Sequence, residues 1–251
     1  MGPEDHRLMS NKPQTGNTLY LVMPAYNEEE SIRDVINSWY PVLDVCGPES
    51  CLVVADSGST DYTHQILVEM AESLSKLVIL SDTGKQHGPK LIALYRYAIE
   101  HGADYIFQTD SDGQTNPSEF YSFWKARHRY DAVLGYRPQR GDGASRAFVE
   151  KVVCLLLKLY FGVKVPDANA PFRLMKCDLT AKYIDRLPED YFLPNIMLTA
   201  WFSYYHENIA FRKITFEPRR GGKGSLNIPR IIRIGWNALG DFRRFKKDMK
   251  S

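Results

Sequence analysis

The first half of the chain alternates short runs of apolar residues with longer stretches in which apolar residues recur at helical spacing. This alternation is typical of repeated strand–helix–strand units, which form a mostly parallel sheet flanked by helices. We therefore expect an α/β fold with helices on both faces of the sheet. The predicted strands are residues 18–23, 51–55, 77–80, 105–109 and 132–135, and the predicted helices lie near 28–39, 60–73, 90–101 and 117–129.

The second half of the chain is less regular. It predicts a loop at 138–145, helices at 146–160, 178–187 and 193–205, and strands at 170–175 and 209–216. From residue 228 onwards, Ile231, Trp236 and Phe242 fall on one helical face and Arg233 and Arg244 lie largely opposite. We expect a flexible segment at 1–16, a single catalytic domain at 17–227 and a basic amphipathic C-terminal helix at 228–251.

The C-terminal end of the chain is strongly basic. The 251 residues carry a net charge of +2, but residues 212–251 contain 12 basic and 3 acidic side chains. Such a basic end indicates an anionic partner: a phosphate, a nucleic acid or a lipid surface. Because the sequence contains no recognisable nucleic-acid-binding motif, we do not expect a nucleic acid partner.

Several features of the sequence predict a cytoplasmic protein. Residues 1–16 lack the apolar core of a signal peptide, and no apolar run is long enough to span a bilayer. The four cysteines contain no CxxC pair, which favours buried free thiols in a reducing compartment.

Unusual polar residues follow three of the predicted strands. The sequences are PAYNEE at 24–29, DSGSTD at 56–61 and DSDGQ at 110–114. Each alone is compatible with an ordinary strand-to-helix turn, which uses the same residue types. In open α/β sheets, however, ligands bind beyond the carboxyl ends of the strands, so three such turns together indicate a binding site.

Asp110 and Asp112 are the clearest candidates for chemistry. Two carboxylates two residues apart at a strand end can both face one divalent cation. Mg²⁺ and Mn²⁺ prefer such oxygen ligands and retain coordination positions for substrate phosphates. The alternative is an Asx turn that caps the next helix.

With these three turns in their order along the chain, the sequence resembles glycosyltransferase family 2, from about Thr18 to about Gly240. Within this family it is most similar to the dolichol- and polyprenyl-phosphate sugar synthases. The resemblance implies the GT-A nucleotide-diphospho-sugar transferase fold, Mg²⁺ or Mn²⁺ as cofactor, and a UDP- or GDP-sugar as donor.

The resemblance also implies roles for individual residues. The first turn would cradle the base and ribose of the nucleotide, and the second would read the base. Asp110 and Asp112 would hold the metal, with Gln114 as a further contact in the lipid-phosphate subgroup. The residues implied for nucleotide binding are Pro24, Tyr26, Glu28, Asp56, Gly58 and Asp110.

Later segments supply candidates for the phosphates and the acceptor. Arg137 resembles an arginine beside the phosphates, and Lys223 lies in a glycine-rich basic loop, GGKGS at 221–225. This loop is not a P-loop, because Glu217 and Gly224 stand at positions where that motif needs a glycine and a hydroxyl residue. The segment from Asp167 to Arg173 resembles the acceptor side of the family, with Pro171 in place of the usual glycine.

The sequence leaves two acceptor classes open. A polyprenyl phosphate is already an anion and needs no general base, whereas a saccharide hydroxyl must lose a proton to a carboxylate, for which Asp190 is the candidate. The resemblance implies in-line displacement with inversion at the anomeric carbon in either case. A helix-capping turn is the alternative interpretation of Asp190.

We expect an enzyme of cell-envelope assembly that is peripheral on the cytoplasmic face of the membrane and contacts it through the C-terminal helix. Packing of this helix on the protein's own core is the alternative. A nucleotidyltransferase is a less favoured class, because those enzymes usually carry a glycine-rich basic loop where this chain has PAYNEE.

Overall fold

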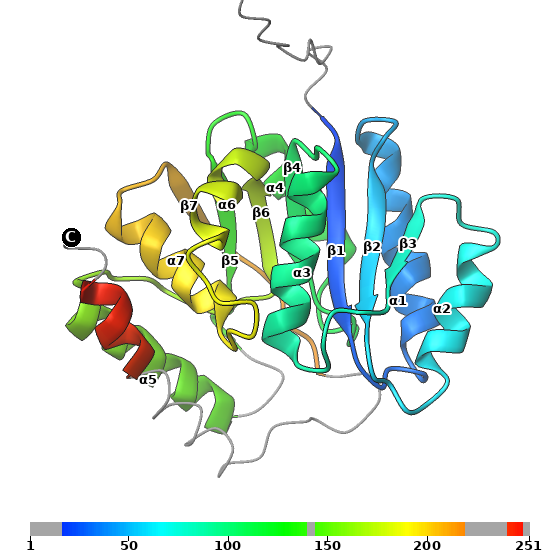
Figure 1. The fold of residues 1–251 in the computed structure, drawn as a ribbon. Coiled ribbons are helices and arrows are strands. Elements are labelled where there is room, and N and C mark those ends of the chain that lie inside the picture. Colours follow the sequence, from blue (N-terminus) through cyan, green and yellow to red (C-terminus); the bar gives the residue numbers. More distant parts are fainter. Residues whose placement is uncertain (1–16, 140–143, 219–239, 248–251) are drawn as a thin grey trace, which may run out of the picture.

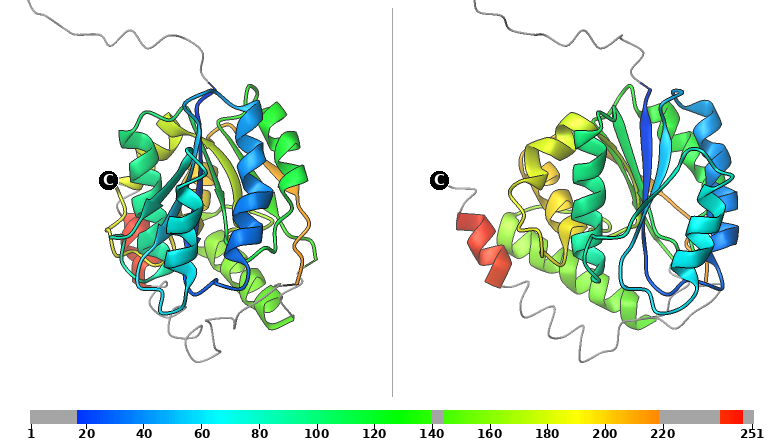
Figure 2. Two further views of the ribbon diagram at one scale, coloured as in Figure 1. Left: turned by 90° about the vertical axis from the view of Figure 1, so that its right-hand side faces the viewer. Right: turned by 45° about the vertical axis from the view of Figure 1, so that its right-hand side comes forward.

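The computed structural model describes residues 17–139, 144–218 and 240–247, which form a seven-stranded sheet with helices on both faces (Figures 1 and 2). The strands are β1 (Leu19–Ala25), β2 (Cys51–Asp56), β3 (Leu77–Leu80), β4 (Tyr105–Thr109), β5 (Ala132–Tyr136), β6 (Phe172–Lys176) and β7 (Ile209–Lys213). The helices are α1 (Ile32–Trp39), α2 (Thr63–Ala71), α3 (His87–Glu100), α4 (Phe120–Ala126), α5 (Ala144–Phe161), α6 (Cys177–Ile184) and α7 (Pro194–Tyr204), with 3₁₀ turns η1 (Tyr40–Val45) and η2 (Pro117–Glu119).

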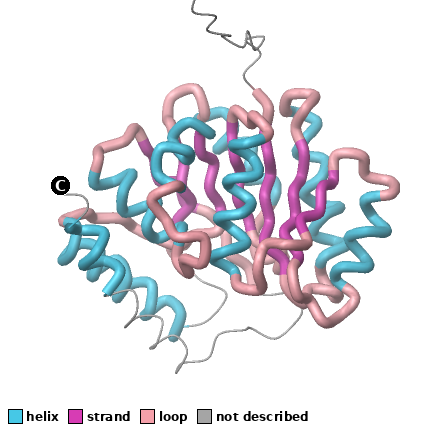
Figure 3. The backbone as a smooth tube through the Cα atoms, viewed as in Figure 1, coloured by secondary structure: helices cyan, strands magenta, loops and turns pink. Residues whose placement is uncertain are grey.

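The strand order is β3-β2-β1-β4-β6-β5-β7. The pairs β1–β2, β1–β4, β2–β3 and β5–β7 are parallel, which confirms the expected mostly parallel sheet. β6 is antiparallel to both of its neighbours, a reversal that the apolar pattern did not predict. Its cause is visible in Figure 3: α5 lies below the sheet instead of crossing its face, so the chain re-enters the sheet from the edge at which β5 ends.

Two apolar clusters hold the sheet between its helices. One contains Leu21, Trp39 and Phe107, and the other contains Val22 and Trp201. The alternation of β1 between the two faces explains why nearly every residue of this strand is buried, as expected of a central parallel strand. All four cysteines are free thiols, as the sequence predicts, but only Cys51 and Cys177 are buried, whereas Cys46 and Cys154 are half-buried.

The described part of the C-terminal helix packs on the protein's own core. Phe242 and Phe245 are buried at residues 240–247, and their rings contact Phe161, Tyr191 and Trp201. Residues 228–239, which carry most of the predicted apolar face, lie outside the described residues. Across the ranges that the structure describes, none of the helices has the length and apolar composition of a membrane span.

The N-terminus of α3 approaches a later segment of the chain at Gly88. A Cβ atom at this position would lie 2.3 Å from the carbonyl oxygen of Tyr191 and 2.6 Å from that of Phe192. Glycine is therefore required here by the close contact of two backbone segments.

We predict that Gly88→Ala lowers the free energy of unfolding by about 1–3 kcal/mol, the usual cost of overpacking. Chemical denaturation would measure this loss. Gly240→Ala is the matched control, because nothing lies within 4 Å of a Cβ there and alanine is favoured in a helix. Equal stability of Gly88→Ala and the unmodified chain would contradict the close contact.

Candidate active site

The three polar turns of the sequence meet at one edge of the sheet. β1 lies between β2 and β4 and is parallel to both, so the three carboxyl ends fall side by side, at the lower edge in Figure 1. Ser111 donates a hydrogen bond to the carbonyl of Pro24 (2.8 Å), which joins the third turn to the first. The edge is the place where an open α/β sheet binds its ligand.

The first and second turns are hydrogen-bonded to each other at several points. The backbone N–H groups of Asn27, Glu28 and Glu29 donate to side chains in or directly after the second turn, at 3.0, 2.7 and 3.1 Å. In return, the N–H of Thr60 donates to the Asn27 side chain (2.8 Å) and that of Tyr62 to Glu29 (2.9 Å). The accepting groups are Ser59 and Asp61 of the second turn and Thr63, the first residue of α2.

Asp61 is one of these accepting groups, and its pKa reflects that role. Burial raises the pKa of its carboxyl, but hydrogen bonds from Thr63 and the N–H of Glu29 outweigh this effect and lower it below the ordinary value. Several side chains of the second turn (residues 56–61) therefore hold the first turn in place through hydrogen bonds.

Asp56 ends β2 and is almost fully buried. One carboxylate oxygen accepts a hydrogen bond from Ser59 (2.5 Å), and the other lies 3.2 Å from Nδ1 of His64. Gly58, two residues on, has a φ of +75°, and a Cβ there would meet the side chain of Lys85 at 2.6 Å. The second turn thus favours glycine for its backbone conformation, and the side chain of Lys85 packs against this position.

Lys90 is a site residue that sequence reasoning missed. It lies in the first turns of α3 with only 1% of its surface exposed, and its ammonium group donates to the carbonyl of Ala25 and sits 5.2 Å from the ring centroid of Tyr26. Burial lowers its pKa to about 8, although the negative charge of Asp56 acts in the opposite direction. A cation is therefore placed between the first two turns, beside the half-exposed ring of Tyr26.

The third turn holds Asp110, Asp112 and Gln114. The N–H of Gln114 donates to Asp112 (3.2 Å), and its side-chain Nε2 donates to the carbonyl of Glu217 (2.6 Å). Only the Oε1 oxygen of this amide could therefore face a cation. Two carboxylates and one amide oxygen fit Mg²⁺ or Mn²⁺, which bind few protein ligands and complete their shell with water and phosphate oxygens.

A chain of buried hydrogen bonds ends on Asp110. Tyr95 donates to Oδ1 of Asn195 (2.6 Å), Nδ2 of Asn195 donates to Gln108 (3.0 Å), and Nε2 of Gln108 donates to Asp110 (3.1 Å). Tyr95, Asn195 and Gln108 are each at most 2% exposed. The three residues come from α3, α7 and β4, so no local pattern in the sequence could have shown that they form one network.

Arg137 follows β5 and is bound to buried carboxylates. Its guanidinium donates two hydrogen bonds to Asp167 (2.8 and 3.0 Å), its backbone N–H donates a third (3.2 Å), and Glu150 of α5 lies 3.7 Å away. Burial would raise the pKa of Asp167, but the bonds from Arg137 lower it; burial and the neighbouring Asp167 raise the pKa of Glu150. The arginine expected beside the phosphates is thus paired with the segment that resembles the acceptor side.

The other predicted residues occupy different places. Arg173 is 1% exposed in β6 and donates to the carbonyl of Asn195 (2.9 Å) and to Thr199. Asp190 is exposed in the turn before Tyr191. Burial, with a smaller contribution from the charge of Asp190, raises the pKa of Asp241 in the C-terminal helix. Lys223 lies outside the described residues.

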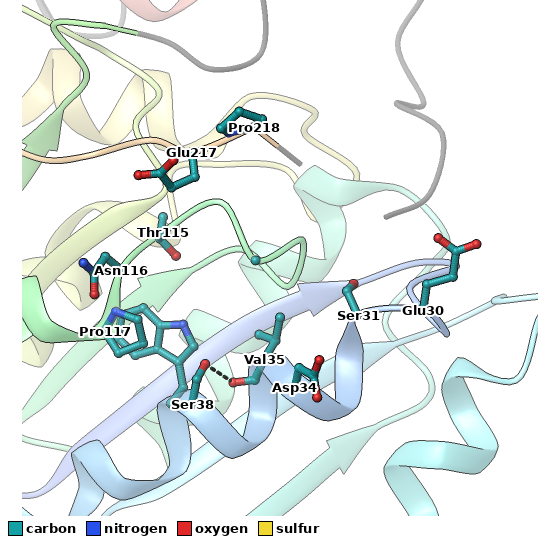
Figure 4. Close-up of a pocket in the computed structure, with 12 residues that line it drawn as sticks. Glu30, Ser31, Asp34, Val35, Ser38, Thr115, Asn116, Pro117, Glu217 and Pro218 are labelled. Carbon is teal, nitrogen blue, oxygen red and sulfur yellow. Dashed lines mark hydrogen bonds between the residues drawn. The ribbon is translucent and has the colours of Figure 1, made fainter. Parts of the chain in front are cut away.

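A cavity of about 460 Å³ opens beside the third turn, between α1 and the segment leading to Pro218 (Figure 4). Its lining includes Gly113 and Thr115 but also three carboxylates, those of Glu30, Asp34 and Glu217. Because these carboxylates would repel phosphates, we do not place the phosphates of a nucleotide in this cavity.

We predict that Gln108→Met lowers the affinity for Mn²⁺ about 10-fold, because residues that orient a metal ligand typically contribute 10–100-fold. Titration of the purified protein with Mn²⁺, followed by electron paramagnetic resonance, would measure this affinity. Thr180→Val is the matched control: it removes the hydrogen bond that the buried Thr180 of α6 donates to the carbonyl of Lys176 (3.1 Å), and it should leave Mn²⁺ affinity unchanged. Equal affinities for Gln108→Met and the unmodified chain would refute a positioning role.

Curated relatives of this chain are bacterial lipid-phosphate sugar transferases. It is 26% identical over 175 residues to the undecaprenyl-phosphate 4-deoxy-4-formamido-L-arabinose transferase of Shewanella sediminis, covering 69% of this chain and 53% of that protein. It is 25% identical over 213 residues to the undecaprenyl-phosphate mannosyltransferase of Micrococcus luteus, covering 82% and 86%. The chain spans about half the length of the first of these relatives.

Solved structures show the same fold at lower identity. A glucosyl-3-phosphoglycerate synthase of Mycobacterium tuberculosis, in complex with Mn²⁺, UDP and phosphoglyceric acid, superposes with a TM-score of 0.67 at 20% identity, covering 90% of this chain and 79% of that one. The likeness confirms the GT-A fold expected from the sequence. The family model described as glycosyl transferase family 2 matches residues 20–184, which include all three turns and the sheet edge at which they meet, and this chain belongs to that family.

Proposed function

We propose that this protein is an inverting, metal-dependent glycosyltransferase that moves a sugar from a nucleotide-diphospho-sugar to a polyprenyl phosphate. The observation that carries this proposal is the meeting of the three turns at one sheet edge, with Asp56, Lys90 and the Asp110–Asp112 pair. The names of the undecaprenyl-phosphate relatives support the lipid acceptor. Transfer to a saccharide hydroxyl is the alternative.

The first two turns would hold the nucleotide. Pro24, Tyr26 and Glu28 would cradle base and ribose, and Asp56 would read the base beside Gly58. The hydrogen bonds between the two turns support this role, because they fix the site before the donor binds. The charge of Lys90 would favour an anionic ligand at this edge.

Asp110 and Asp112, with Gln114, would hold Mg²⁺ or Mn²⁺. When bound, the ion would stabilise the negative charge that develops on the leaving phosphate. The chain from Tyr95 to Gln108 keeps the carboxylate of Asp110 oriented for this task. We also propose that Lys223 supplies a cation to the leaving group.

Arg137 has a narrower role in this proposal. Its guanidinium is paired with Asp167 and Glu150, so much of its charge is compensated where it lies. We therefore assign it to orienting the acceptor-side segment beside the phosphates. Asp190 would act as general base only if the acceptor were a hydroxyl, since a lipid phosphate is already an anion.

A donor-by-acceptor screen tests the function. The purified protein with Mn²⁺ is offered labelled UDP- and GDP-sugars with and without a short polyprenyl phosphate. We expect label in the organic phase only when the lipid phosphate is present. Asp112→Asn, which keeps the shape of the side chain but removes its charge, should fold normally and lose transfer by more than about 100-fold.

Label that stays in water on an added saccharide would overturn the lipid-phosphate acceptor and make Asp190 the next residue to replace. Full, chelator-insensitive activity of Asp112→Asn would overturn the metal assignment.

Affinity for UDP should decrease as pH rises through the pKa of Lys90, about 8. Between pH 7 and 9 the protonated fraction falls to about a tenth, and we expect a loss of affinity approaching 10-fold by calorimetry. Lys90→Met should bind UDP weakly with no such dependence. Lys125→Met, which removes an exposed cation from α4, should behave like the unmodified chain.

The contribution of Lys90 to stability changes with pH in the opposite direction from this decrease in UDP affinity. The pKa of Lys90 is lowered in the folded state, so between pH 8 and about 10.5 the unfolded chain binds more protons at this residue, and its contribution to stability rises with pH. UDP affinity that is independent of pH in the unmodified chain would show that Lys90 does not act on the ligand.

A further inference from the structure

Helix α5 carries an exposed apolar stripe. Four large side chains lie on its outer side: Phe148 and Leu159 are each 67% exposed, Leu155 is 54% exposed and Val152 is 37% exposed. Their spacing of four, three and four residues places all four along one narrow face of the helix. The stripe is about 16 Å long at 1.5 Å per residue.

The same helix is anchored by its other side. Leu157 and Phe161 are buried, and Phe161 contacts Phe242 of the C-terminal helix at a ring-centroid distance of 5.5 Å. The outer stripe is therefore additional to the face that packs on the core. A helix that is apolar on both sides is expected to be covered on both, so the outer face of α5 indicates a contact with something else.

The charges on α5 show what kind of contact fits. Lys151 and Lys158 are exposed and lie seven residues, about two helical turns, apart along one flank of the stripe. The only acidic residue of α5, Glu150, is turned inward: it accepts a hydrogen bond from the N–H of Ala168 (2.7 Å) and lies near Arg137. An apolar strip with a cationic flank matches a membrane surface, in which acyl chains lie beneath anionic headgroups.

The position of α5 also fits this partner. The helix lies below the sheet, on the side where β1, β2 and β4 end (Figures 1 and 2). The contact between Glu150 and Arg137 ties it to the end of β5 at the same edge. A surface that holds α5 would thus lie beside the candidate active site.

We propose that the outer face of α5 is the lipid-contacting surface of this protein, inserted at the level of the headgroups of an anionic membrane. This inference rests on the proposed function, since the acceptor would be embedded in that membrane. A second copy of the chain is a poorer fit, because four such side chains present on the order of 400 Å², about half of what each partner in a stable interface buries.

Vesicle flotation of the full chain tests the proposal. The probes are vesicles of phosphatidylcholine with and without about 30% phosphatidylglycerol, whose anionic headgroups attract lysines. We expect binding to the anionic vesicles and at least about a 10-fold loss of affinity in Leu155→Gln/Leu159→Gln. Lys151→Gln/Lys158→Gln should lose affinity for the anionic vesicles only. Val68→Gln, at a 45% exposed position on α2, is the matched control and should bind normally.

Activity assays separate this proposal from the proposed function. With a short, water-soluble polyprenyl phosphate, Leu155→Gln/Leu159→Gln should transfer sugar as well as the unmodified chain; with a long-chain acceptor in vesicles it should be about 10-fold slower. If the unmodified chain transfers no sugar to either acceptor, the proposed function fails, whereas the flotation result still decides whether α5 contacts lipid.

Two results would overturn the lipid-contacting surface. One is normal vesicle affinity in a folded Leu155→Gln/Leu159→Gln variant. The other is a dimer of the unmodified chain in light scattering that this variant converts to a monomer, which would assign the stripe to a second copy.

Discussion

The parallel pairing of β1 with β2 on one side and β4 on the other is the constraint on which the site depends. It forces three turns that are far apart in the sequence to end at one edge of the sheet. Once there, Ser59, Thr60 and Thr63 bond to the first turn and Ser111 bonds to Pro24. Each turn alone resembles an ordinary strand-to-helix turn, and the sheet brings the three together into one candidate site.

The sequence predicts features that depend on neighbours along the chain. The apolar runs located every strand approximately, and the polar residues after them indicated the edge where the turns meet. The direction of β6 was not predictable, because it depends on the path of α5 outside the sheet. Lys90 and Asn195 were missed because their roles come from contacts with β1 and β4. Such long-range contacts leave no pattern in the residues that neighbour them along the chain.

Two buried arginines lie near β5, α5 and β6, and each is held by specific partners. Arg137 has Asp167 and Glu150 as partners, whereas Arg173 is held by the Asn195 carbonyl and the Thr199 hydroxyl. A buried ion costs several kcal/mol in desolvation and is tolerated only with good hydrogen bonds. Buried interactions of this kind add little net stability, but they disfavour alternative packings of β6, α5 and α7, because a different arrangement would leave a buried charge without its partners.

Gly88 joins the two halves of the molecule without a side chain of its own. Its α-carbon lets the backbone of α3 lie directly against the Tyr191–Phe192 backbone, only two residues from Lys90. No side chain stands between the two segments that could rotate and take up a displacement. The helix that carries Lys90 and the segment that leads into α7 are therefore expected to shift together, so a displacement of that segment would be transmitted through α3 to Lys90.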